Sequence, residues 1–102
     1  MGIRARARSP WADRMARMTF TLDPVHDVVD ATFDGCILET EDDVTRWRED
    51  VERELARFGR RVDLLINLDG LVVRPLAARA FGVQRAAVLS RHARTSHRFG
   101  GD

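Results

Sequence analysis

The pattern of apolar and polar residues along the chain predicts alternating strands and helices. The run from Val62 to Val73 is apolar at most positions, which is typical of a strand without a face in water. Such strands lie inside parallel sheets that helices cover on at least one side. The residues before this run and those after Arg74-Pro75 show helical apolar spacing. This order of elements predicts a small α/β domain with helices packed on a mixed sheet.

The first helix is predicted between Thr40 and Gly59. Thr40 is a favourable N-cap, and the acidic residues 41–43 suit the positive end of a helix. Gly59 predicts the end of the helix, since glycine readily takes the left-handed conformation found there. Apolar residues at spacings of three and four predict one buried face, made by Val44, Trp47, Val51, Leu55 and Phe58.

The segment before this helix has two interpretations. Residues 19–33 predict one half-buried strand, or a bent hairpin with its turn at Asp23-Pro24. In both cases Val29, Ala31 and Phe33 share one face. Residues 1–18 show no period that would bury a face and predict a flexible, Arg-rich extension, so that residues 19–102 form a single domain.

The second helix is predicted after Arg74, because proline suits the first helical turn. Its predicted stripe is poorer in large apolar side chains than that of the first helix and contains Leu76, Ala77, Ala80, Phe81, Gln84, Ala87, Val88 and Arg91. The tail from Thr95 to Asp102 has the composition of a loop. No internal repeat is evident.

Composition narrows the class of protein. A chain of 102 residues is long enough for one domain. The single cysteine, Cys36, fits a reducing compartment. No apolar stretch is long enough to span a bilayer. These features predict a cytoplasmic protein without a membrane span. The net charge is only +1, but residues 19–54 hold twelve acids against three arginines, whereas residues 55–102 hold nine arginines against three acids. This segregation indicates either two partner-facing surfaces or an acidic helix beside a basic one.

The layout from Gly35-Cys36-Ile37-Leu38-Glu39-Thr40 to Leu64-Leu65-Ile66-Asn67-Leu68-Asp69-Gly70-Leu71 resembles STAS-like domains, which include sulfate-transporter tails and anti-sigma-factor antagonists. The match covers residues 19–92 and is better for small bacterial STAS-like proteins than for the regulators. The resemblance implies a regulatory or protein-interaction module. Antagonists carry a phosphorylated hydroxyl at the start of the second helix, whereas residues 72–76 here, Val-Val-Arg-Pro-Leu, offer none.

STAS domains usually continue with a further strand and helix. This chain predicts neither after its second helix, which leaves two interpretations. The last element is missing, so that an unpaired sheet edge invites a partner strand or a homodimer, or the reading frame is truncated.

Two groups of residues are candidates for ligand binding. Asp69 lies near the carboxyl end of the central strand, where open α/β sheets bind ligands, and with Arg74 it forms a candidate carboxylate–guanidinium site. The alternative is that Asp69 caps a turn. The second group is a basic patch at the end of the second helix, made by Arg91, His92, Arg94, His97 and Arg98. It suits phosphate or RNA, or it simply opposes the negative helix end.

No catalytic residue, metal site or cofactor is predicted. His92 and His97 are five residues apart, whereas a helical metal pair is spaced by four. The sequence therefore predicts a non-enzymatic regulatory or protein-interaction module. The alternative is nucleic-acid or anion binding through the basic N-terminal arm and the end of the second helix.

Overall fold

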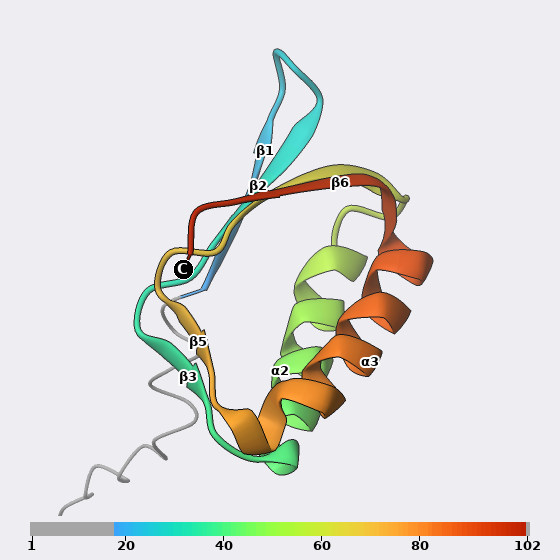
Figure 1. Ribbon diagram of the computed structural model, residues 1–102. Helices are drawn as coiled ribbons and strands as arrows, with labels where there is room; N and C mark the ends of the chain where they lie inside the picture. Colours follow the sequence, from blue (N-terminus) through green and yellow to red (C-terminus); the bar gives the residue numbers. More distant parts are fainter. Residues whose placement is uncertain (1–17, 102) are drawn as a thin grey trace, which may run out of the picture.

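A computed structural model describes residues 18–101 of this protein, which form two sheets and two helices (Figure 1). In chain order the elements are β1 (Thr19–Asp23), β2 (Val28–Thr32), β3 (Cys36–Leu38), α2 (Glu41–Ala56), β4 (Val62–Asn67), β5 (Leu71–Val73), α3 (Pro75–His92) and β6 (Ala93–Phe99). The larger sheet has the order β1-β2-β4-β6, and β3 and β5 form a second sheet. Only the β1–β2 pair is antiparallel. The predicted α/β class with a mixed sheet is confirmed.

Residues 19–33 form a hairpin, as the second of their two interpretations predicts. The side chain of Asp23 accepts a hydrogen bond from the backbone N–H of Val25 at 2.9 Å, and Asp27 has a left-handed φ of 56°. These two features turn the chain back so that β1 pairs with β2.

The chain after the hairpin follows the same path twice. A strand of the large sheet ends at an Asp-Gly pair, a short strand of the small sheet follows, and a helix leads back to the next parallel strand. The two breaks are Asp34-Gly35 and Asp69-Gly70, whose glycines have φ of 68° and 84°. Because β3 and β5 pair with Cys36 opposite Leu71, the two breaks lie at matching positions. The fold thus has an internal structural repeat that the sequence pattern did not predict.

The prediction of one continuous strand from Val62 to Val73 is wrong. Gly70 divides this run into β4 and β5, which belong to different sheets. One face of this run is also partly exposed to solvent. In β4, Val62 and Leu64 are buried. The next residue, Leu65, is 37% exposed. Both helices lie on one side of the large sheet (Figure 1), so the other side is covered by neither.

The core lies between this sheet and the helices. The predicted face of α2 is confirmed, with Val44, Trp47, Val51 and Leu55 buried and Phe58 packed against them. Thr40 caps the helix as predicted: its hydroxyl accepts from the N–H of Asp43, whose side chain accepts from the N–H of Thr40. In α3 only Ala77 and Val88 are buried. The core is therefore held mainly by one face of α2 and the inner face of the sheet.

The prediction of a loop after the second helix is also wrong, because Ala93–Phe99 form the edge strand β6. β6 pairs in parallel with β4, and a register shift at Val62/Asp63 accommodates the turn out of α3. An edge strand exposed along most of its length has no need of apolar residues, and β6 is exposed from Arg94 onward. The fold thus continues past the second helix with a strand that the composition of the tail concealed.

The predicted flexible extension, residues 1–18, lies outside the described residues except for Met18. Within residues 18–101, neither helix combines the length and the apolar character needed to cross a bilayer.

Candidate functional site

The predicted Asp69–Arg74 pair is not joined in the structure. Asp69 lies in the turn between β4 and β5, where its Oδ1 accepts from the backbone N–H of Gly101 at 2.8 Å. Arg74 lies beyond β5 as the N-cap of α3, and its backbone N–H donates to the carbonyl of Leu38 at 2.9 Å. No hydrogen bond or ion pair links the two side chains among residues 18–101. The contact made by Asp69 fits the alternative interpretation, a carboxylate that caps a turn.

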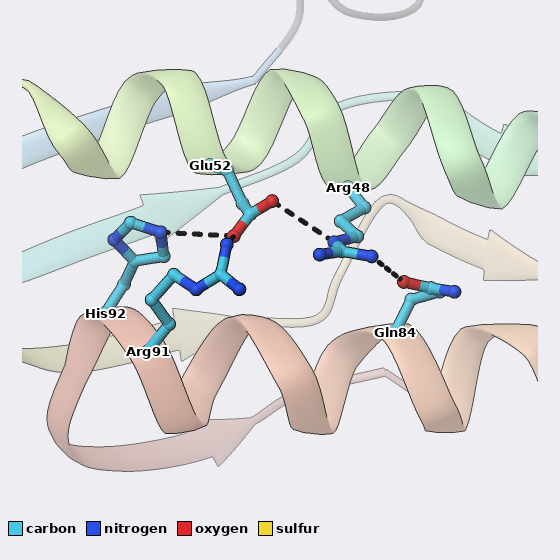
Figure 2. Close-up of polar contacts among 5 residues, drawn as sticks. All are labelled: Arg48, Glu52, Gln84, Arg91 and His92. Carbon is cyan, nitrogen blue, oxygen red and sulfur yellow. Dashed lines mark hydrogen bonds and ion pairs between the residues drawn. The ribbon is translucent and has the colours of Figure 1, made fainter.

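Arg91 and His92, from the predicted basic patch, face a carboxylate. Arg91 Nη1 and His92 Nε2 lie 3.1 and 3.2 Å from Glu52 Oε2 on α2 (Figure 2). The other oxygen of Glu52 accepts from Arg48 Nε at 3.1 Å, and Arg48 also donates to Gln84 Oε1 at 2.7 Å. The network thus bridges the two helices at two levels, and the residue numbers rise together along both helices, which shows that α2 and α3 run in the same direction.

The charge of this network is balanced around Glu52. Burial raises the pKa of Glu52, but the charge of Arg48 and hydrogen bonds from His92 and Arg48 hold that pKa below its usual range. Glu52 is therefore an anion at neutral pH, and it offsets part of the positive charge of its neighbours. This arrangement joins the helices and leaves less charge for an external anion.

Arg94 on β6 is also paired with a carboxylate. Its Nε and Nη2 donate to the two carboxylate oxygens of Asp63 at 3.0 and 2.7 Å, and Thr95 Oγ1 donates to the same group at 2.7 Å. The hydrogen bonds from Arg94 and Thr95 hold the pKa of Asp63 well below its usual range. Bidentate pairs of this kind are the strongest of the common side-chain hydrogen bonds.

His97 and Arg98 lie on opposite faces of the sheet. His97 is level with Leu65 on the face that the helices leave open, and Arg98 is level with Ile66 on the face that the helices cover. The seven predicted residues therefore divide among separate places rather than forming one site. Their role in ligand binding stays a prediction.

A cavity that the sequence did not predict lies between the helices and the sheet. Its volume is about 40 Å³ and its wall is apolar. The residues around it are Phe20, Ala31, Phe33, Trp47, Val51, Leu55, Leu64, Ile66, Leu68, Leu71, Phe81, Arg85, Val88, Leu89 and Arg98. Arg98 is the only predicted site residue among them. Arg85 could have been found from the sequence, because it stands four residues from both Phe81 and Leu89 in an otherwise apolar row.

No protein-family model, curated protein or solved structure matches this chain.

Cys36 is fully buried, and residues 18–101 contain no group of three or more His, Cys, Asp or Glu side chains placed to hold a metal ion. The features left for binding are the surface of α3 and the cavity beneath it.

Proposed function

We propose that this chain is a non-enzymatic protein-interaction module of STAS-like type, and that it self-associates through the outer face of α3. This face consists of Leu76, Arg79, Gly82, Val83, Ala86, Ala87 and Ser90, all exposed. Leu76 and Val83 are 79% and 62% exposed, and Arg79 is the only charged member. An exposed apolar patch of this kind often marks a site of protein–protein contact, so the outer face of α3 is the observation on which the proposal rests.

The first helix provides the contrast. Most exposed residues of α2 are charged, among them Glu41, Asp42, Arg46, Glu49 and Arg53. That pattern is typical of a helix whose outer side stays in water. The two helices lie side by side (Figure 1), yet only α3 leaves large apolar side chains in solvent.

Charge favours a second copy of the chain as the partner. α2 begins with Glu41 and Asp42, which with Leu76 at the start of α3 line an open hollow. α3 ends with Arg91 and His92. Because the helices run in the same direction, acidic and basic residues lie at opposite ends of the helical layer. An antiparallel pairing of two copies brings each acidic end to a basic end.

The spacing along α3 suits a two-fold axis at Val83. Leu76 and Ser90 lie seven residues to either side of Val83, about 10 Å at a helical rise of 1.5 Å per residue. Leu76 of one copy would then face Ser90 of the other. Gly82 and Ala86 allow the helix backbones to approach, and a Cβ at Gly82 would meet no other element of the described chain within 4 Å.

Sedimentation of the full chain tests this proposal. We expect a dimer whose dissociation constant rises at least tenfold in Val83→Glu, because the new carboxylate would be buried against its symmetry mate. Thr45→Glu adds the same charge to the exposed side of α2 and should leave the dimer unchanged. A wild-type chain that stays monomeric at 100 μM, or a Val83→Glu variant that dimerises equally well, would rule the proposal out.

The alternative function, nucleic-acid binding, predicts a different result. It requires affinity for RNA or DNA that falls steeply with salt. Arg94 is paired with Asp63, and His97 and Arg98 lie on opposite faces of the sheet. Both observations argue against this alternative, because they reduce and divide the charge of the patch. Binding to a labelled oligonucleotide at two salt concentrations distinguishes the two functions.

A further inference from the structure

The cavity beneath α3 has two arginines at its border. Arg85 comes from α3 and Arg98 from β6, two elements that follow each other directly in the chain. Since the wall of the cavity is apolar, the side chains border it through their methylene stems. Burial and the positive charge of Arg98 both lower the pKa of Arg85, so the two guanidinium groups lie close enough to repel each other.

Neither arginine has a carboxylate partner in the described part of the chain. The comparison with Arg48 is informative because both Arg48 and Arg85 are half-buried. The side chain of Arg48 is bound by Glu52 and Gln84, whereas the side chain of Arg85 makes no hydrogen bond or ion pair within residues 18–101. A partly buried cation normally has an anionic partner. Arg85 lacks such a partner, and the exposed Arg98 beside it adds a second positive charge that attracts an external anion.

Trp47 adds an independent observation at the same cavity. Its side chain borders the cavity and packs on Phe81, with ring centroids 5.0 Å apart. The residue is only 4% exposed, yet its indole N–H has no acceptor. A buried donor without an acceptor is rare in native proteins. Because Trp47 borders the cavity, its fluorescence reports on a ligand that enters there.

We propose that Arg85 and Arg98 bind the carboxylate of a short aliphatic ligand whose hydrocarbon part fills the cavity beside Trp47. This inference does not depend on the proposed self-association. The volume of about 40 Å³ decides the size of the ligand. It corresponds to roughly one or two water molecules, whereas an engineered cavity that holds benzene measures about 150 Å³. The part of the hydrocarbon that lies inside the cavity is therefore one or two carbons long and not a ring.

The same chemistry has two sources, a free short-chain acid or the carboxyl end of a peptide whose last residue is small and aliphatic. Butyrate represents the first source, and a short peptide ending in valine the second. The amide of that peptide lacks the terminal carboxylate and serves as its control.

Tryptophan fluorescence of the full chain provides the readout. The chain has two tryptophans, Trp11 and Trp47, so the variant Trp11→Phe reports on Trp47 alone. In this background we expect a saturable change with butyrate and none with butylamine or benzoate at equal ionic strength. Saturation with the valine peptide at lower concentration than with butyrate, but not with its amide, would assign the site to a peptide terminus.

Substitution of Arg85 tests the role of the charge. Arg85→Met keeps most of the stem but removes the guanidinium group, and we expect the affinity to fall about tenfold or more. Arg46→Met removes a charge from the exposed side of α2 and should leave the affinity unchanged. Equal losses in both variants, or no saturable response to butyrate or the peptide in the parent, would overturn the inference. Thermal unfolding of each variant confirms that it is folded.

Discussion

Two independent constraints require glycine at position 70. Its φ of 84° lies in the left-handed region, and an added Cβ would stand 2.3 Å from the carbonyl oxygen of Phe33. This close approach is where the two Asp-Gly breaks meet, since the N–H of Cys36 donates to the carbonyl of Gly70 at 2.8 Å. A side chain at this position would push the two crossover units apart.

Comparing substitutions at Gly70 and Gly59 separates the effect of the left-handed φ from the effect of the close approach to Phe33. We expect Gly70→Ala to lower the free energy of unfolding by about 3 kcal/mol or more, from strain and from overlap with Phe33. Gly59 has a similar φ of 69° but open space around it, so Gly59→Ala should cost about 1 kcal/mol. Urea denaturation measures both. Equal losses would mean that the approach to Phe33 does not limit the site.

Asp63 makes stability depend on pH. Its pKa is held below its ordinary value in the folded state, so its ionised form favours folding. This contribution is complete above about pH 4, the pKa of an unfolded aspartate, and is lost as the pH falls further. We therefore expect Asp63→Asn to be less stable than wild type at pH 7 and closer to it at pH 2.5. A stability difference that is the same at both pH values would contradict the assigned pairing with Arg94.

At the scale of elements, Glu52 is the residue through which the helices are joined. Its side chain is 21% exposed and meets Arg48, Arg91 and His92. Removing its charge leaves these groups repelling one another in a partly desolvated place. We expect Glu52→Gln to lower the free energy of unfolding by about 1–2 kcal/mol, below the value for a fully buried pair.

Glu49 supplies the matched control for this change. It lies on the exposed side of the same helix, where charge contributes little to stability. Glu49→Gln should stay within about 0.5 kcal/mol of wild type. If the two variants lose the same stability in chemical denaturation, the network does not hold the helices together.

The elements that could be predicted from sequence are those that bury a regular face. The stripe of α2 and its Thr40 cap were evident because packing and capping there follow local rules. β6 was missed because an exposed edge strand is held by backbone hydrogen bonds to β4, and such bonds leave no apolar pattern. The division of residues 62–73 was missed because Asp69-Gly70 breaks a run whose composition alone favours one strand.

The candidate site was less predictable, because its residues are far apart in the chain. Arg91 and His92 were recognised as basic, but their common partner Glu52 lies about 40 positions earlier. Arg85 and Arg98 meet only because α3 and β6 fold onto the same cavity. Sequence reveals the kinds of side chain present, whereas topology decides which of them meet.

At the scale of the whole molecule, the proposed dimer predicts a specific cross-link. An axis at Val83 brings this position close to itself, within the Cα separation of about 7 Å that a disulfide allows. We expect Val83→Cys to form a covalent dimer on mild oxidation, visible on a non-reducing gel. Thr45→Cys, on the exposed side of α2, should not, and the native Cys36 is fully buried. Cross-linking at Thr45 but not at Val83 would place the contact elsewhere.

The repeated path of the chain bears on how the molecule assembles. Val29 of β2 pairs with Leu64 of β4, and Leu64 pairs with Ser96 of β6, so the two parallel ladders close loops of nearly equal length. Closure entropy changes only slowly with loop length. One half of the repeat runs from β2 through α2 to β4 and the other from β4 through α3 to β6, so neither half has a kinetic advantage from chain length. β4 belongs to both halves. Assembly can therefore start from either half, and it is complete only when the second half docks on the strand that the first has already ordered.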